Sequence, residues 1–337
     1  MLDPGDEVEG YVIELVIEIA ASFDRYTVTA PDGAQRMLEV LPVSGAGLIE
    51  AMHSSGPIGK LDHPNVLAVH DVIEVSARPG IVHDLIEAPT LRQWMASPTV
   101  TLEQTLMVFR GIVEGIAYGQ KLGLVHLELR AGTVRVETSE DGMHTPKIEG
   151  MGIAKAIFEA MATHKGVSRS KGGLAEPRHA APEAIRNPHR ADGRADMYSL
   201  GCILYEMLAG THPFAGLNYY DCYSAKREER WAPLDEVNPV AGPLLTEIVT
   251  ELMRAEPERR IQTGKALLER LDAIALPQSV TASRRPQERH PLDSGQLLSG
   301  GYLLPQGAPS NAGQMWGLVA VVAIAGVGVM LAAYLLI

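Results

Sequence analysis

The side chains best suited to chemistry lie in one short segment near the middle of the chain, Val125–Arg130. His126, Glu128 and Arg130 alternate there with apolar residues, so an imidazole, a carboxylate and a fixed positive charge follow one another closely. An imidazole or carboxylate held beside a hydroxyl can orient it and accept its proton. For His126 the other interpretation is packing in the core, and this is the one that we favour.

The overall charge and the cysteine count limit the possible functions. The 337 residues include 29 basic and 41 acidic side chains, a formal net charge of −12. Binding to nucleic acid needs a basic face, so no nucleic-acid partner is expected. Cys202 and Cys222 are too few and too far apart for a disulfide framework or a zinc site, which fits a reducing, cytosolic setting. The acidic amino terminus does not resemble a secretory signal.

A long apolar segment covers residues 315–337 and carries no charged side chain. Its length matches the hydrocarbon core of a bilayer, so we predict a single transmembrane helix in contact with lipid rather than a buried core helix. Trp316 and Tyr334 near its ends are typical of membrane interfaces, and the basic residues before it place the preceding domain in the cytoplasm. Gly328 and Ala332 could pair two such helices into a homo-oligomer.

The preceding part of the chain changes from predicted strands to predicted helices. β-prone runs predict strands at 11–19, 26–29, 35–41, 66–75, 81–85, 125–136 and 147–148, with a turn at 31–33. Apolar residues at helical spacing predict helices at 102–117, 194–210, 244–254 and 264–274. The helix from Arg194 is apolar nearly all round, which predicts a place inside the domain. Residues 277–314, rich in Pro, Gly, Ser and Gln, predict a flexible linker.

Six short blocks follow one another in a specific order. They are His63–Asn65, Val125–Arg130, Lys147–Lys155, Ala181–Glu183, Asp196–Gly201 and Glu256–Arg260. Together they resemble the protein kinase domain, of the eukaryotic-like (Hanks-type) Ser/Thr type found in bacteria.

The resemblance implies an α+β, bilobal protein-kinase-like fold over residues 10–276, with a nucleotide cleft between the lobes. The antiparallel β-rich N-lobe would cover about 10–88, and the mainly helical C-lobe about 89–276. The tail at 1–9, the linker and the C-terminal transmembrane helix complete the predicted domains.

This chain departs from the family pattern where the family binds nucleotide. Glu18, Ala20 and Phe23 stand at the positions of the phosphate-binding glycines, and Glu39 replaces the phosphate-binding lysine. Replacing attraction by repulsion at 4 Å changes the interaction by up to about 8 kcal/mol at an effective dielectric constant near 20. His83 would place a polar side chain at the back of the cleft.

The catalytic and metal-binding positions of the family are also altered. Glu128, Arg130 and Thr133 replace its catalytic aspartate, lysine and metal-binding asparagine, and Gly150 replaces its metal-binding aspartate. Gly150 has no side chain, and Mg²⁺ prefers carboxylate and phosphate oxygens. The resemblance therefore implies no intact catalytic or metal site and no cofactor, apart from possible weak ATP binding without Mg²⁺.

Other family positions retain residues that support the fold. The resemblance assigns structural roles to His126, Met151, Glu183, Asp196 and Arg260, with Glu183 and Arg260 forming an ion pair.

Residues 152–183 correspond to the activation segment of the family. Within this segment the apolar side chains at helical spacing predict a short helix against the cleft: Ile153, Ala156, Ile157, Ala160 and Met161.

These observations lead to two main hypotheses. The first is a catalytically inactive pseudokinase at the cell membrane that acts as a protein-binding scaffold or an allosteric regulator in signalling, with protein partners not identified by the sequence. The second is a divergent Ser/Thr kinase that uses Glu128 and Arg130 with an unusual nucleotide position. An intermediate hypothesis retains nucleotide binding without catalysis.

Overall fold

The structure is a computed structural model that describes residues 2–19, 23–44, 48–54, 58–163, 168–169 and 177–274, with two short strands, β11 (Gln296–Leu297) and β12 (Leu303–Leu304). The predicted linker at 277–314 lies outside the described residues apart from those two strands. The predicted transmembrane helix at 315–337 lies entirely outside them. Among the described residues, no helix has the length and apolar character needed to cross a bilayer.

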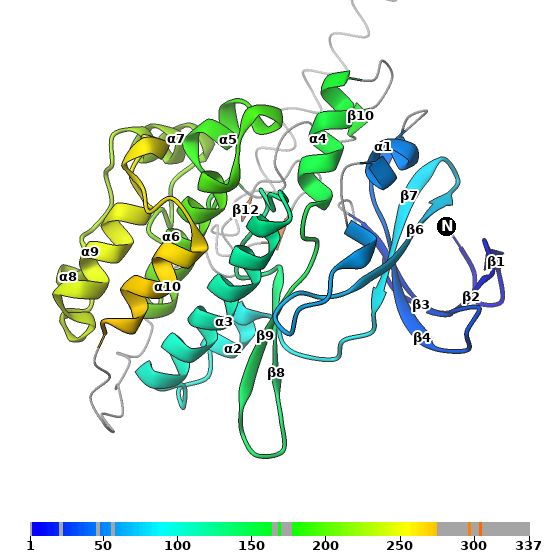
Figure 1. The fold of residues 1–337 in the computed structure, drawn as a ribbon, viewed down its shortest axis with the longest axis horizontal. Helices are drawn as coiled ribbons and strands as arrows, with labels where there is room; N and C mark the ends of the chain where they lie inside the picture. The colour runs from blue at the N-terminus through cyan, green and yellow to red at the C-terminus, as the bar shows by residue number, and fades with distance from the viewer. Residues whose placement is uncertain are drawn as a thin grey trace, which may run out of the picture. The chain divides into compact units, whose positions relative to one another are not determined.

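The amino-terminal lobe is built on a six-stranded antiparallel sheet (Figure 1). In spatial order its strands are β1 (Glu7–Val8), β2 (Tyr11–Ile19), β3 (Asp24–Thr29), β4 (Gln35–Val40), β7 (Arg78–Asp84) and β6 (Val69–Val75). Alternate residues of β3 and β4 point into one core, where Tyr26 and Leu38 are fully buried. This period of two is the pattern of a sheet with one buried face.

The predicted turn at 31–33 connects β3 to β4. The side chain of Asp32 accepts the Ala34 N–H at 2.9 Å, and Gly33 has a positive φ of 81° that glycine adopts without strain. This turn sets the register that places Arg25 of β3 directly opposite Glu39 of β4.

The segment before β6 joins the two lobes, which explains why the strand predicted to begin at residue 66 begins at Val69. Asn65 Nδ2 donates to the Pro146 carbonyl at 3.0 Å, and the Asn65 carbonyl accepts the Ile148 N–H at 2.9 Å. Val66 forms a single parallel bridge with Ile148. The backbone of this segment is therefore bonded to the larger lobe instead of continuing the sheet.

The carboxyl-terminal lobe is mainly helical. Its helices are α2 (Leu91–Met95), α3 (Leu102–Lys121), α5 (Pro182–Arg186), α6 (Gly193–Ala209), α7 (Tyr219–Arg227), α8 (Leu234–Val237), α9 (Gly242–Leu252) and α10 (Gly264–Asp272). Short 3₁₀ turns are η2 (Pro188–Arg190), η3 (Pro239–Ala241) and η4 (Pro257–Arg259). A hairpin of β8 (Val134–Thr138) and β9 (His144–Ile148) follows α3, so the stretch predicted as β-prone from residue 125 is a strand only from Val134.

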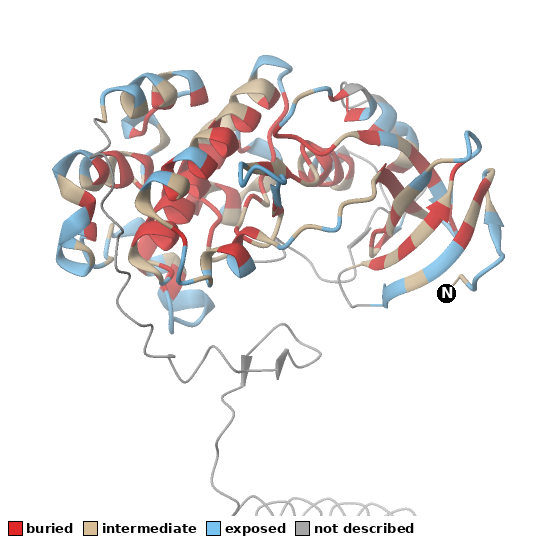
Figure 2. Ribbon diagram, turned by 90° about the horizontal axis from the view of Figure 1, so that it is seen from below, coloured by how far each residue is buried: buried red, intermediate tan, exposed pale blue. Residues whose placement is uncertain are grey.

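Helix α6 occupies the centre of this lobe, as its apolar residues predicted. Asp192 caps its start, and Gly210 ends it with a left-handed φ of 73°. At Gly201 an added Cβ would lie 2.8 Å from side-chain atoms of Leu252 and Met253, so glycine permits the close approach of α9. Figure 2 shows buried residues gathered on the central helices and exposed residues on the outer ones.

The predicted helix in residues 152–183 is present as α4 (Ile153–Thr163). It packs against α1 (Leu48–Ser54) of the amino-terminal lobe and against η2, and Figure 1 shows α4 beside α1. Most of its side chains are buried, and Lys155 donates to the carbonyls of His189 and Ala191 at 2.7 and 2.8 Å. Further along, β10 (Ser168–Arg169) pairs with β5 (Val43–Ser44), and η1 (Ile58–Lys60) follows α1.

Candidate functional site

The segment that carries His126, Glu128 and Arg130 is a loop whose backbone is hydrogen-bonded to Asp196 of α6. The two carboxylate oxygens of Asp196 accept the backbone N–H groups of His126 and Leu127, each at 2.8 Å. Asp196 is fully buried, and this burial raises the pKa of its carboxyl although His126 and the two N–H bonds oppose the shift. Leu127 has a left-handed φ of 65°, and its side chain is buried. The loop is thus fixed mainly through its backbone.

The polar side chains of this loop are partly engaged within it. Thr133 Oγ1 accepts the Arg130 N–H at 3.1 Å and donates to the carbonyls of Arg130 and Glu128 at 3.0 and 3.3 Å. His126 is buried, and its Nε2 donates to the Glu149 carbonyl at 2.9 Å. Glu128 and Arg130 are both half-buried.

The positions expected to hold Mg²⁺ offer few ligands. Gly150 contributes no side chain and has a φ of 75°, and the hydroxyl of Thr133 is bonded to its own loop. Met151 is buried and packs on Gly119 of α3. Within the described ranges, no three His, Cys, Asp or Glu side chains gather as a metal site would require. The two positions that the family uses for Mg²⁺ therefore offer no carboxylate or amide oxygen of their own side chains.

A row of alternating charges begins on the sheet of the amino-terminal lobe. Arg25 and Glu39 are cross-strand neighbours, and Arg25 Nε lies 2.9 Å from Glu39 Oε2. The guanidinium of Arg25 also stacks on the ring of Phe23, with its carbon 4.2 Å from the ring centroid. Burial opposes the charge of Arg25, but Glu39, Glu149 and Glu18 outweigh it and raise the pKa of the guanidinium.

The row continues across the cleft into the larger lobe. Arg25 Nη2 lies 3.7 Å from Glu149 Oε2, and Arg135 Nε of β8 lies 2.8 Å from Glu149 Oε1. Arg135 Nη1 donates to the Ala88 carbonyl, where the chain passes between the lobes, at 3.2 Å. We call Glu39, Arg25, Glu149 and Arg135 the ion-pair row. All four side chains are only 13–21% exposed, so the row is largely shielded from solvent where the two lobes meet.

The residues at the predicted nucleotide-binding positions lie in surroundings that differ from one residue to the next. Glu39 belongs to the ion-pair row, Glu18 is exposed on β2, and Ala20 lies outside the described residues. Phe23 supports Arg25. His83 is buried, and its Nδ1 lies 3.0 Å from the Asp84 carbonyl.

Sequence reasoning missed Arg25, Glu149 and Arg135, which make up most of the row. The β3–β4 turn could have revealed the contact between Arg25 and Glu39, because the turn fixes their register. The sequence held no comparable signal for the contact of Arg25 with Glu149, which depends on how the lobes meet.

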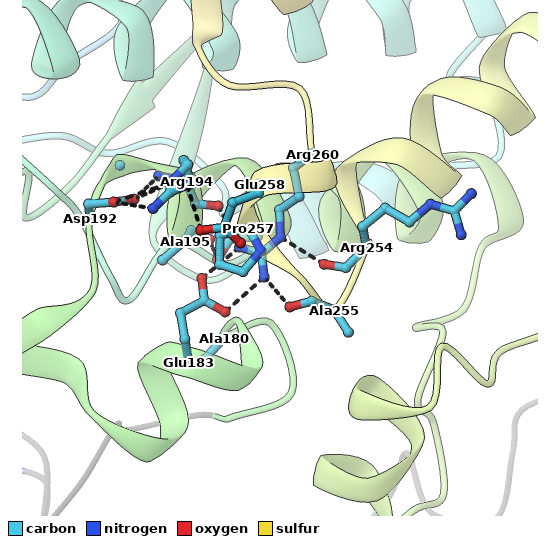
Figure 3. A network of polar contacts seen from close by, with 12 residues as sticks. Ala180, Glu183, Asp192, Arg194, Ala195, Arg254, Ala255, Pro257, Glu258 and Arg260 are labelled. Atoms are coloured by element: carbon cyan, nitrogen blue, oxygen red, sulfur yellow. Dashed lines mark hydrogen bonds and ion pairs between the residues drawn. The ribbon is translucent and has the colours of Figure 1, made fainter.

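The remaining predicted pair, Glu183 and Arg260, joins α5 to the residue after η4 in the larger lobe (Figure 3). Arg260 Nη1 and Nη2 donate to the two Glu183 carboxylate oxygens at 2.6 and 2.8 Å. Its other donors reach the carbonyls of Arg194, Arg254 and Ala255 at 2.7–2.9 Å. All five guanidinium N–H groups are therefore used, and the Arg260 side chain is fully buried.

Comparisons with known proteins agree with this architecture. A family model for the protein kinase domain matches residues 54–270. A probable serine/threonine-protein kinase of Streptomyces coelicolor is 28% identical over 259 residues, which cover 75% of this chain and 36% of that protein. The serine/threonine-protein kinase PknJ of Mycobacterium tuberculosis is 26% identical over 221 residues, which cover 64% and 36% of the two chains. The chain thus spans about a third of the length of these relatives.

Solved structures share the fold at lower identity. The PknI kinase domain of Mycobacterium tuberculosis superposes with a TM-score of 0.63 at 18% identity, covering 81% of this chain and 99% of that one. Rad53 1–466 in complex with AMP-PNP gives a TM-score of 0.60 at 20% identity, covering 78% and 65%. With its two lobes, its six motif blocks and the match over residues 54–270, the chain belongs to the protein kinase family, among the bacterial Hanks-type Ser/Thr kinases.

Proposed function

We propose that this kinase domain is a pseudokinase, a protein-binding scaffold or allosteric regulator that does not transfer phosphate. The observation that carries the proposal is the ion-pair row. In it the charges that line the cleft neutralise one another across the two lobes, with Arg25 between Glu39 and Glu149.

A nucleotide entering this cleft would meet the row at a high energetic cost. A phosphate near Glu39 or Glu149 would be repelled by about 4 kcal/mol per unit-charge pair at 4 Å and an effective dielectric constant near 20. Using Arg25 as a phosphate ligand would leave the partly buried Glu39 without its partner and Glu149 with Arg135 alone. Gly150 has no side chain, and the Thr133 hydroxyl is bonded within its own loop, so these two positions favour no Mg²⁺ ion that would offset that repulsion.

The parts of the domain that support its shape are present, which suits a recognition role. Asp196 holds the loop backbone, Arg260 holds α5 to the loop before η4, and α4 packs on the amino-terminal lobe. The proposal includes a protein partner and a tether to the membrane through residues 315–337, with the kinase-like domain on the cytoplasmic side. It includes neither a nucleic-acid partner nor a cofactor.

A thermal-shift titration of the full chain with ATP, with and without Mg²⁺, tests the proposal, together with a phosphate-transfer assay. We expect no stabilisation that depends on Mg²⁺ and no transfer above background. The same titration on Arg25→Met controls for the row, because removing Arg25 leaves the acidic side chains in place and should not create ATP binding. Stabilisation by ATP and Mg²⁺ together with turnover would overturn the proposal.

The second candidate is a divergent Ser/Thr kinase. It is supported by the relatives, which are kinases, by Rad53, which was solved with AMP-PNP, and by Glu128, which keeps a carboxylate in the catalytic loop. If this candidate holds, Glu128→Ala abolishes turnover while Glu114→Ala, on the partly exposed side of α3, leaves it unchanged. Stabilisation by ATP without turnover would instead establish nucleotide binding without catalysis.

A further inference from the structure

A second cluster of titratable groups lies in the carboxyl-terminal lobe, away from the cleft residues. His179 Nε2 lies 2.9 Å from Glu206 Oε2 of α6, and the ring of His212 meets that of His179 edge-on, with centroids 4.4 Å apart. His212 Nδ1 accepts the Phe214 N–H at 3.1 Å. His179 belongs to residues 177–183, which we call the anchor segment because they tie the end of the activation segment to the lobe.

Each of these two imidazoles has one buried nitrogen that lacks a hydrogen-bond partner. These are Nδ1 of His179, which is 1% exposed, and Nε2 of His212, which is 9% exposed. A buried polar atom without a partner loses the solvation that it would have in water. A proton added to either nitrogen would therefore place a new charge where no hydrogen bond receives it.

The neighbouring positive charges make a proton on His212 still less favourable. Arg92 of α2, Arg178 of the anchor segment and Lys226 of α7 all act on His212 as positive charges. Glu206 is the carboxylate that faces them, and it is already bonded to His179 and lies 3.8 Å from Arg92. Glu183 also acts on Lys226, so in the described part of the chain this cluster sets three basic groups and two histidines against two carboxylates.

The same cluster fixes the backbone of the anchor segment. The buried Lys226 ammonium donates to the carbonyls of Arg178 and Ala180 at 2.5 and 2.9 Å, and Ser199 Oγ of α6 donates to the His179 carbonyl at 3.0 Å. The anchor segment also ends at Glu183, the partner of Arg260. Any rearrangement of His179 consequently moves a segment that reaches the start of α5.

We propose that His179, His212 and Glu206 form an acid-sensitive latch, in which protonation of His212 releases the anchor segment from α6. Neutral His212 fits the closed latch, and a charged His212 can be solvated only when the segment opens. Opening would change the surface around α5 and α7 and so control what binds there. The latch does not depend on whether the cleft binds nucleotide.

The direction in which pH shifts the latch follows from the protonation of His212 in the closed and open forms. Burial, followed by nearby positive charges that include Lys226, Arg178 and Arg92, holds the pKa of His212 well below its usual value in the closed form. In the open form the pKa returns to about 6.5. Stability of the closed form is then lost as the pH falls through about 6.5. One such histidine raises the opening equilibrium about tenfold between pH 7.5 and 5.5.

Hydrogen exchange on the full chain in detergent tests the latch, with rates corrected for the intrinsic effect of pH. We expect protection of residues 177–183 to fall about tenfold from pH 7.5 to 5.5, whereas protection of α3 changes less than twofold. In His212→Asn the amide oxygen can still accept the Phe214 N–H without titrating, so the tenfold loss should shrink below threefold. The matched control His189→Asn removes an exposed histidine from η2 and should retain the full loss.

A second variant, His179→Gln, keeps a donor for Glu206 but loses the ring contact that connects His212 to the anchor segment, and should also reduce the pH response. Protection of the anchor segment that is unchanged at pH 5.5, or a full response in folded His212→Asn, would refute the latch. If both variants fail to fold, the wild-type comparison of residues 177–183 with α3 decides the matter alone.

Discussion

The ion-pair row in the cleft and the Glu183–Arg260 pair in the larger lobe both connect segments that are distant in sequence, but they satisfy their charges differently. Arg260 is fully buried, and three of its five donors reach backbone carbonyls of its own lobe. Arg25 is partly exposed and relies on two carboxylates, of which Glu149 belongs to the other lobe. The first network holds whatever the lobes do, whereas the second is complete only when they are closed.

The largest expected effect comes from the network around the fully buried Arg260. Arg260→Met leaves Glu183 and three carbonyls without their donors, and should lower the free energy of unfolding by about 3–5 kcal/mol. Urea unfolding of the full chain in detergent measures this loss. Arg259→Met is the matched control, because Arg259 is 56% exposed and 3.9 Å from Glu256, and should cost less than about 0.5 kcal/mol. A loss below 1 kcal/mol for Arg260→Met would contradict the contrast between the networks.

A smaller effect is expected in the cleft. Arg25→Met should lower the free energy of unfolding by about 2 kcal/mol, because Glu39 and Glu149 lose a partly buried partner. A double-mutant cycle with Glu39→Gln should give a coupling of about 1–2 kcal/mol. Arg36→Met on the neighbouring strand serves as control, since its partner Asp32 is largely exposed, and should change stability by less than about 0.5 kcal/mol. Zero coupling between Arg25 and Glu39 would show that the row adds no stability.

The smallest expected effect is the change with salt concentration, which should differ between the two networks. Raising the ionic strength from 0.1 to 1 M shortens the Debye length from about 10 to about 3 Å. The coupling of Arg25 with Glu39 should fall by up to about half, while the effect of Arg260→Met stays within about 0.5 kcal/mol, because the Arg260 side chain is fully buried and three of its hydrogen bonds go to uncharged carbonyls. Repeating both unfolding series at the two salt concentrations provides the measurement, and an equal response in both would remove the distinction.

The sequence predicted the parts of the fold that depend on local pattern. The apolar residues of α6 predicted a central helix, Gly210 predicted its end, and the spacing from Ile153 predicted α4. The strand expected from residue 66 begins later because Asn65 bonds to the hairpin of the larger lobe. Such a contact joins residues that are 81 positions apart, and no local pattern encodes it.

The candidate site was predictable only in part, for the same reason. Comparison with the family motif identified the altered position of Glu39, but not its partner Arg25, whose role depends on strand register. The contact of Arg25 with Glu149 requires both the register and the meeting of the lobes. The two histidines of the latch follow no spacing rule, because His179 and His212 approach each other only when the anchor segment packs on α6.

The way in which Asp196 holds the loop has a consequence for mutational tolerance. Its carboxylate binds the peptide N–H groups of residues 126 and 127, which every amino acid except proline carries. The contacts of Asp196 therefore constrain the backbone of the loop and not the side chains of these two residues. A loop anchored in this way can exchange the exposed side chains around it and still follow the same path.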